Sequence, residues 1–473
     1  MKKFTFHASH ARKIAASVLA LALTGSLLGC AGGSLPFGDN PTVVQTEAPT
    51  EPLDTNGAHV VDTGIGEYRF DSYADQLQAA QAEYELHVPP FLPGSYGEFA
   101  MLDASTPRYV LYSDGVYRSE SLARDGVATI MLTGDLMCQG RQQEVGATED
   151  NSFDFRDNFT YVSEMFSEVD FVVGNLECTL SETASLMMEE PRVDGGIHCN
   201  APSTYLDAVR SAGFDLLMTA NNHCLDTGLQ GLYQTIAHLD QYGFLHTGTF
   251  LDADDSRFVL AQIDGIKVGF LSYTTKFNGN QKHLTEEGQE IFLNKYTEEA
   301  LIADVEAAKA QGAEYIIAYN HWGTEYSNAQ TEEQELWAKE MADAGVDYIV
   351  GSHPHALQPY DIITASDGRE VPVIYSLGNF VSHQTKTVSK ETVVIQLELV
   401  RDENGDVVLR SDGAIPSRTF KTFLGSNYTT IPMTEPYADG HFSKYFEEAY
   451  DNITAVIGSK IDILGTIKIE GDK

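Results

Sequence analysis

Short apolar runs alternate with amphipathic segments from residue 126 onward. The runs at residues 127–135 (VATIMLTGD), 171–177 (FVVGNLE) and 346–355 (VDYIVGSHPH) each close on polar residues, and segments of helical spacing such as 203–213 separate the runs. Short runs that are almost continuously apolar are typical of buried strands in a largely parallel sheet with helices on both faces. The pattern therefore predicts an α/β fold.

Two later apolar runs, residues 373–381 (VIYSLGNFV) and 392–400 (TVVIQLELV), have no helix between them. Strands that follow each other in this way suggest a mixed sheet and a second sheet layer. We assign residues 126–400 to one main domain. The mixed, Pro- and Gly-interrupted residues 58–125 are expected to form an N-terminal extension packed on it, and residues 401–473 a C-terminal extension.

The chain begins with the layout of a secretory signal peptide, residues 1–29. A basic stretch precedes an apolar run that is shorter than the roughly 20 residues of a membrane span, and the run ends at Gly29–Cys30. The cysteine resembles the lipid-bearing residue of a bacterial lipobox, so we expect lipidation at Cys30. A plain signal peptide or an N-terminal anchor helix with an incidental cysteine is the alternative. Residues 30–57, rich in Gly, Pro and Thr, are expected to be a flexible tether.

The charge is strongly acidic, with 69 Asp and Glu against 30 Lys and Arg. Removal of residues 1–29 takes away four basic residues and no acid, so the formal charge moves from −39 to −43. Such a body is expected to repel nucleic acid and offers no basic patch for anionic lipid. We therefore expect an extracytoplasmic protein held to the cell membrane only by its N-terminal lipid. Solubility of an exported protein is the simpler reason for the acidity.

Metal-binding residue types stand where the predicted strands end. Sites in open α/β sheets form beyond the carboxyl ends of the strands, so the fold is expected to bring these groups to one rim. Each short motif taken alone is also compatible with a turn or a helix cap, and it is their joint occurrence that predicts a metal site. The candidate ligands are Asp135, Glu177, Asn222, His321, His353 and His355.

Oxygen and imidazole ligands of this kind suit borderline divalent metals such as Mn, Zn or Fe. Six ligating side chains exceed the three or four that hold one catalytic zinc. Two ions about 3.5–4 Å apart, bridged by a carboxylate, would use all six. The sequence therefore predicts one or two divalent metal ions.

Six sequence blocks carry a resemblance to a known family. In chain order they are GDLMCQGR, GNLECTL, ANNHCLDTG, NHWGTEY, GSHPHALQP and YSLGNF. The chain resembles the bacterial capsule-synthesis CapA-like (poly-γ-glutamate capsule) family over roughly residues 126–400. That family is similar in fold to calcineurin-like metallophosphoesterases, so the resemblance implies a two-layer β-sandwich flanked by helices.

The resemblance also implies roles for the ligands. It implies that Asp135 and His355 bind a first metal and that Glu177 bridges both metals. The second metal would be held by the remaining three, which are Asn222, His321 and His353.

Other roles follow from the same resemblance. His223 would be a general acid or a hydrogen-bond donor to the transition state, and Asp226 would orient it. Arg141 would clamp a phosphate oxygen, with a solvated surface arginine as the equal alternative. The broader superfamily commonly places a histidine two residues after the first aspartate, where this chain has Met137. The first metal is therefore expected to be weakly held or absent.

Four cysteines remain after Cys30, at positions 138, 178, 199 and 224. Their number permits disulfides, but they lack the CxxC spacing of a structural zinc site. They are candidates for soft ligands, disulfide partners or small buried hydrophobes, and we favour the last. A disulfide between Cys178 and Cys199 would pin the loop between them.

Three functions are compatible with these features. The first is a surface-anchored, metal-dependent hydrolase in capsular polymer biosynthesis or processing, in which His223 protonates the leaving group. The second is a non-catalytic polymer-binding or scaffold component of a synthase complex, and the third is an exported phosphoesterase. The ligand set favours chemistry, whereas Met137 favours binding. The expected partners are an anionic capsular polymer or its precursor, and membrane synthase subunits.

Overall fold

The computed structural model describes residues 61–62, 68–69, 108–119, 126–149, 152–189, 198–421, 428–434 and 443–465. All of them belong to the unit of residues 54–473, and the unit of residues 1–53 contains none of them. The predicted signal peptide, Cys30 and the predicted tether therefore lie outside the described residues. Among the helices that are described, none has the length and apolar character that crossing a bilayer requires.

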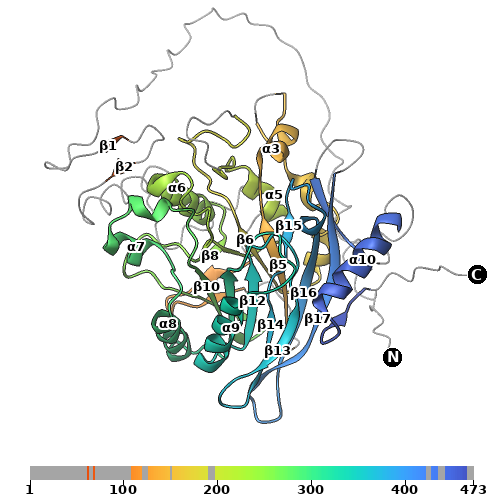
Figure 1. The fold of residues 1–473 in the computed structure, drawn as a ribbon. Helices are drawn as coiled ribbons and strands as arrows, with labels where there is room; N and C mark the ends of the chain where they lie inside the picture. Colours follow the sequence, from red (N-terminus) through yellow and green to blue (C-terminus); the bar gives the residue numbers. More distant parts are fainter. Residues whose placement is uncertain are drawn as a thin grey trace, which may run out of the picture. The chain divides into compact units, whose positions relative to one another are not determined.

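Within the described residues, the first of two large sheets has eight strands, and its central strands β10, β11, β12 and β14 run parallel (Figure 1). In spatial order its strands are β13 (Tyr360–Thr364), β14 (Glu370–Ile374), β12 (Tyr348–Ser352), β11 (Tyr315–His321), β10 (Ile266–Thr274), β9 (Val259–Ile263), β4 (Tyr117–Arg118) and β3 (Val110–Leu111).

The second large sheet has nine strands and is also mixed. Strands β5 to β8 are parallel, whereas β16, β17 and β18 add antiparallel strands at one side. The order is β18 (Tyr428–Pro432), β17 (Val407–Lys421), β16 (Glu391–Arg401), β5 (Val127–Leu136), β6 (Phe171–Leu176), β7 (Leu216–Met218) and β8 (Leu245–Thr247), with β15 (Asn379–Val381) paired to β5 and β19 (Asp462–Ile463) to β17. A separate two-stranded sheet joins β1 (Val61–Asp62) and β2 (Tyr68–Arg69).

Helices connect most of the parallel strands. The α-helices are α3 (Gly140–Gly146), α4 (Ser163–Ser167), α5 (Tyr205–Ala212), α6 (Gly228–Gln241), α7 (Glu286–Phe292), α8 (Glu298–Ala310), α9 (Glu332–Ala344) and α10 (Ser443–Ile457). Short 3₁₀ helices are η1 (Arg156–Phe159), η2 (Asn280–His283) and η3 (Thr387–Ser389). Helix α5 ends where expected, at Gly213, whose φ of +105° a glycine adopts without strain.

The continuous apolar runs arise because both faces of each sheet are covered. Val173 and Ile317 belong to the cluster that joins the two sheets, and the Phe171 and Phe270 rings stack across it at 5.2 Å. Their sequence neighbours point the other way, because successive side chains of a strand alternate in direction. Ile316 packs into the outer cluster with residues of α8 and α9, which lie together on one side of the strands in Figure 1. The predicted α/β fold with a second sheet layer is confirmed.

Structure continues across the two predicted domain boundaries. In the segment before residue 126, β4 pairs with β9 of the first sheet. In the segment after residue 400, β17 pairs along β16, and α10 contacts both strands (Figure 1). The boundaries themselves stay predictions, but residues on both sides of each contribute to the same sheets.

Candidate metal centre

The strand ends of both sheets meet at one rim. Asp135 is the penultimate residue of β5, and Glu177 directly follows β6, its parallel neighbour. In the other sheet His321 is the last residue of β11, and His353 follows the parallel strand β12. Two pairs of neighbouring parallel strands, one in each sheet, therefore position four of the predicted ligands at this rim.

The loop after β7 is tied to this rim by its asparagines. Asn221 donates from Nδ2 to the Leu176 carbonyl (2.8 Å) and to Asn175 Oδ1 (3.2 Å), and its Oδ1 accepts from the His223 backbone N–H (3.1 Å). Asn222, between them, places its Oδ1 2.8 Å from His321 Nε2. The loop thereby adds an amide oxygen and an imidazole to the cluster.

The His-Pro-His segment has an unusual backbone conformation. His353 and His355 have φ values of +92° and +52°, in the left-handed region that non-glycine residues seldom adopt. The segment is held by the His353 N–H, which donates to Asp135 Oδ2 (3.3 Å), and by the Tyr326 N–H, which donates to the Pro354 carbonyl (2.6 Å). This conformation turns both imidazoles toward the carboxylates.

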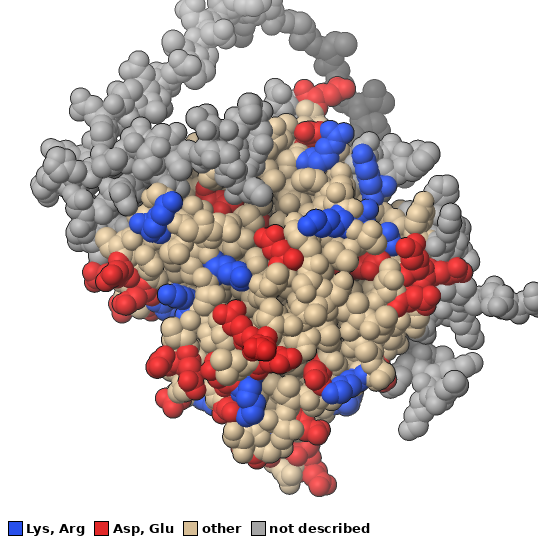
Figure 2. Space-filling view, viewed as in Figure 1, with Lys and Arg blue, Asp and Glu red and all other residues tan. Residues whose placement is uncertain are grey.

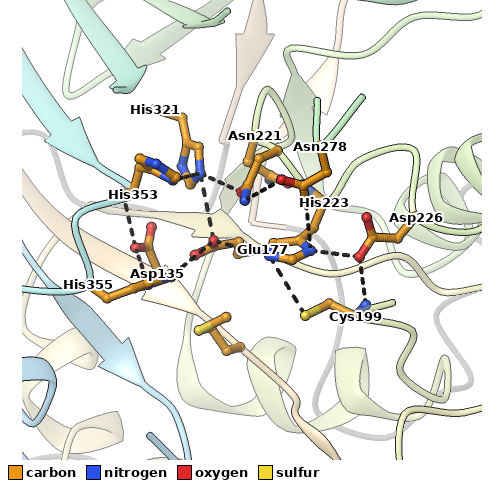
Figure 3. A network of polar contacts seen from close by, with 12 residues as sticks. Asp135, Glu177, Cys199, Asn221, His223, Asp226, Asn278, His321, His353 and His355 are labelled. Atoms are coloured by element: carbon orange, nitrogen blue, oxygen red, sulfur yellow. Dashed lines mark hydrogen bonds and ion pairs between the residues drawn. The ribbon is translucent and has the colours of Figure 1, made fainter. Parts of the chain in front are cut away.

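Glu177 lies at the centre of the cluster and has no donor. Figure 3 shows it between His321, His353 and His355 on one side and His223 on the other. Its side chain is fully buried, and neither oxygen accepts a hydrogen bond from any described residue. Oε1 lies 3.6 Å, 3.7 Å and 3.9 Å from the Nε2 atoms of His321, His355 and His223 respectively. A buried carboxylate without a partner is costly, so this arrangement is suited to a cation.

Two ligand groups share this carboxylate. Asp135, Glu177 and His355 form one group, and Glu177, His321 and His353 form the other; within each, the ligand atoms lie within 4.8 Å of one another. Together with Asn222, the structure brings all six predicted ligands to one place. These buried oxygen and nitrogen donors are suited to divalent metal binding.

Neighbouring polar groups orient the ligands. Asn379 Oδ1 lies 2.8 Å from His355 Nδ1, and Ser352 Oγ lies 2.9 Å from His321 Nδ1. Asn175 Nδ2 donates to Asp135 Oδ1 at 2.8 Å. Because each Nδ1 has a partner, the Nε2 atoms face the carboxylate, as is usual for metal-ligating histidines.

Burial determines the protonation preferences of the cluster. It lowers the pKa of His353 to about 2, with the neighbouring His355 adding to the effect, and it lowers the pKa of His321 well below the usual value, with His353 adding to the effect. Burial and the nearby Asp135 raise the pKa of Glu177 well above its usual value. Uncharged imidazoles are the form that binds metals, and a bound cation would counter the cost of charge on Glu177.

The structure places Asp226 next to His223, as the orienting role predicted for Asp226 requires. Asp226 Oδ2 lies 2.6 Å from His223 Nδ1. Burial opposes a charged His223, but Cys199 and Asp226 outweigh it and raise the pKa of His223 well above the usual value. His223 Nε2 faces Cys199 Sγ at 3.9 Å and Glu177 Oε1 at 3.9 Å.

Arg141 is not part of this cluster. It lies in α3 with an exposed side chain and forms an ion pair with Glu144, one turn away. The structure thus places it as the solvated surface arginine of the two alternatives. Met137, by contrast, is buried, and its Sδ lies 3.9 Å from Gln384 Nε2.

The cysteines are all buried and free of disulfides at the four described positions. The bond considered between Cys178 and Cys199 is therefore absent from the structure. All four pack in apolar clusters, as small hydrophobes do, and Cys199 Sγ in addition lies 3.9 Å from His223 Nε2.

The orienting asparagines and the contact of Cys199 were not predicted from the sequence. Asn175, Asn221 and Asn379 stand inside the motif blocks GNLE, ANNH and YSLGNF, and a polar amide in an apolar strand was the available signal. Cys199 precedes a helix and carries no comparable pattern. Its contact with His223 depends on the tertiary fold.

Comparisons with known proteins agree with the motif blocks. The sequence profile described as "Bacterial capsule synthesis protein PGA_cap" matches residues 129–384. The capsule biosynthesis protein CapA of Bacillus anthracis is 31% identical over 286 residues, covering 59% of this chain and 66% of that protein, just under two thirds of its length. The PGA biosynthesis protein CapA of Bacillus subtilis is 27% identical over 310 residues, covering 64% and 73% respectively.

Solved structures give a weaker likeness. The calcineurin-like phosphoesterase YfkN of Bacillus subtilis aligns with a TM-score of 0.39 and 16% identity, covering 70% of this chain and 98% of that chain. A purple acid phosphatase from yellow lupin aligns with a TM-score of 0.31 and 12% identity, covering 67% and 56%. Scores of this size carry no argument about activity.

Proposed function

The chain belongs to the bacterial capsule synthesis protein PGA_cap family, and from that premise we propose that it is a metal-dependent hydrolase that acts in the biosynthesis or processing of a capsular polymer of the poly-γ-glutamate type. The two Bacillus relatives are named for capsule and PGA biosynthesis, which supports the polymer class. The ligand cluster supports hydrolysis.

The observation that carries the proposal is the unpartnered Glu177 carboxylate. Both of its oxygens are buried without a hydrogen bond from a described residue, and three imidazole Nε2 atoms lie within 3.9 Å of Oε1. This arrangement suits a bound cation. Asp135 and His355 would hold a first ion with Glu177, and His321, His353 and Asn222 would hold a second with the same carboxylate.

A divalent ion, when bound, supplies a Lewis acid that polarises a phosphoryl or carbonyl oxygen and lowers the pKa of water. The protein provides the proton for the leaving group. Asp226 Oδ2, 2.6 Å from Nδ1, keeps that nitrogen protonated, stabilises the imidazolium and aims Nε2 toward Glu177. His223 in its charged form thus carries a transferable proton at Nε2, which it gives to a departing amine or alkoxide.

The setting of the reaction is a proposal from the sequence. The signal-like residues 1–29 and Cys30 support an extracytoplasmic protein anchored by an N-terminal lipid. An anionic polymer or its precursor is the proposed partner, together with membrane synthase subunits and without nucleic acid. Figure 2 shows acidic and basic side chains interspersed over one face, with no continuous basic stripe there for a nucleic acid backbone.

The deciding experiment combines elemental analysis with turnover on the same samples. Protein without residues 1–30 is incubated with Mn²⁺ or Zn²⁺ and assayed on poly-γ-glutamate and on simple phosphoesters. Replacement His223→Ala should lower turnover by roughly 10²–10⁴-fold and leave the manganese content unchanged. Arg141→Ala, on the exposed ion pair, is the control. Turnover that is unaffected by His223→Ala would refute the assigned role.

The scaffold alternative is favoured by one observation, Met137. This buried thioether replaces the imidazole that would complete the first ion position, leaving Asp135, Glu177 and His355 there. Metal without any turnover that depends on His223 would support the scaffold. Replacement Met137→His should increase the number of ions retained after dialysis if the position faces the first ion.

The anchor has its own test. Replacement Cys30→Ser should release the full chain from the membrane fraction or block its processing. Unchanged membrane association together with an unchanged mass would contradict lipidation.

A further inference from the structure

A third group of potential ligands lies on the far side of Glu177. It consists of Cys199, His223 and Asp226, whose ligand atoms lie within 4.8 Å of one another, and all three are buried (Figure 3). None of the three belongs to the two groups described above, and the sulfur sets the new group apart chemically. It therefore calls for its own explanation.

The hydrogen bonds show which atoms are available to an ion. Asp226 Oδ2 is already engaged, because it lies 2.6 Å from His223 Nδ1 and accepts from the Cys199 backbone N–H at 2.7 Å. The carboxylate therefore orients the ring and the cysteine, and does not itself face the ion. The atoms left facing each other are Cys199 Sγ and His223 Nε2, in the carboxylate–histidine–metal arrangement that is common at metal sites.

The spacing suits one ion. Cys199 Sγ and His223 Nε2 are 3.9 Å apart. A zinc ion bound tetrahedrally at the usual Zn–S and Zn–N distances holds its two donors about 3.6 Å apart, so a small adjustment suffices. The carboxylate shared by the two other positions is close, because the unpartnered Glu177 Oε1 lies 3.9 Å from the same Nε2.

We propose that Cys199 and His223 form a further site, adjoining the two positions that share Glu177, for a thiophilic divalent ion such as zinc. A thiolate beside an imidazole selects zinc over manganese or magnesium. Cys199, His223 and Asp226 also resemble a thiol nucleophile with its base and orienting carboxylate, but Cys199 is only 1% exposed. That burial leaves a bare ion as a better guest than a substrate carbonyl.

A consequence follows that rests on the proposed function. An ion on His223 Nε2 occupies the position from which the proton would be transferred. Excess zinc should therefore inhibit turnover that manganese supports, and the inhibition should require Cys199. Binding itself does not depend on the hydrolase proposal, so the two can be tested apart.

The test is a cadmium titration of reduced protein lacking residues 1–30, followed by the ultraviolet charge-transfer band of sulfur bound to cadmium. Wild-type protein should develop the band with one equivalent, and Cys199→Ser should lose it. Cys224→Ser, which removes a buried thiol next to His223 in sequence, should keep it. Asp226→Asn should weaken the affinity about 10–100-fold without removing the band, as expected for an orienting group.

Circular dichroism of each variant checks folding, and wild-type protein provides a second measurement that needs no substitution. Zinc should protect Cys199 of the wild type from iodoacetamide, as read by peptide mass. A band that survives Cys199→Ser, or its absence from the wild type, would overturn the site. Rapid alkylation of Cys199 that zinc does not slow would point to a nucleophilic thiol instead. Loss of turnover in every protein, with the band intact, would count against the hydrolase alone.

Discussion

Two buried carboxylates, Glu177 and Asp215, lie next to the same parallel strands but differ in their hydrogen-bond partners. Asp215 is 1% exposed and accepts from Arg108 Nε (2.9 Å) and from the Val172 N–H (2.9 Å). Glu177 is equally buried and accepts from no described residue. One carboxylate finds its cation within the chain, and the other has a place for a cation from outside.

The difference separates a structural ion pair from a ligand site. Arg108 also donates to the carbonyls of Val169 and Gly213. Its guanidinium group therefore connects the segment before β3 to the second sheet. Around Glu177, burial keeps the imidazoles of His321 and His353 uncharged, so these two neighbours cannot neutralise it. The type of neighbour, more than the degree of burial, indicates which buried acid has a functional role.

The largest expected effect is on metal retention by Glu177→Gln. Because the carboxylate belongs to both ligand groups, the variant should retain no ion at either position after dialysis, as measured by elemental analysis. Glu391→Gln is the matched control, since that buried glutamate already accepts from Asn452 Nδ2 (3.0 Å) and lies near Arg418. Full metal content in Glu177→Gln would show that this carboxylate is not a ligand of either ion, and the contrast with Asp215 would fail.

Next in size is the loss of fold stability in Arg108→Met. Removing the guanidinium leaves Asp215 buried without its cation, which should lower the free energy of unfolding by about 3–5 kcal/mol. Denaturant unfolding measures this, and metal content per folded molecule should stay the same. A loss below about 1 kcal/mol, the range of exposed pairs, would mean that Asp215 does not depend on Arg108.

A smaller effect is expected from Asn379→Ala. Its Oδ1 orients His355 from 2.8 Å, and loss of such a group typically weakens metal affinity about 10–100-fold. Competition with a chelator measures the affinity. Asn328→Ala, which removes an amide that donates to the Leu357 carbonyl, serves as the control and should leave the affinity unchanged.

The smallest effect is expected from Arg141→Ala. The exposed side chain forms an ion pair with the equally exposed Glu144, so the free energy of unfolding should change by no more than about 0.5 kcal/mol. Turnover on a phosphoester should not change either. A fall in turnover of tenfold or more would show that Arg141 takes part in the reaction.

The sequence predicted the cluster well because its information is local. Asp135, Glu177, His321 and His353 each follow an apolar run, and the rule that parallel strands end at one edge places them together without coordinates. Val172 and Val173 point to opposite faces of the sheet. Because both faces are covered, the two residues belong to one continuous apolar run in the sequence.

What the sequence could not predict depends on distant contacts. Arg108 lies 107 residues before Asp215, and no spacing rule links them. Asp226 contacts both Cys199 and His223, and Asn379 lies 24 residues after His355, beyond strands β13 and β14. Such pairs are set by how the two sheets and their loops pack, which hydrophobic periodicity does not encode.

The most direct measurement is the unfolding of metal-free protein with and without added ion. Wild-type protein stripped by chelator should gain about 2.7 kcal/mol when manganese is added at 100 times its dissociation constant, because the ion binds the folded state alone. Glu177→Gln at the same concentration should gain nothing. No gain in the wild type, or an equal gain in both proteins, would contradict the account of Glu177 as a carboxylate that is built to receive a cation.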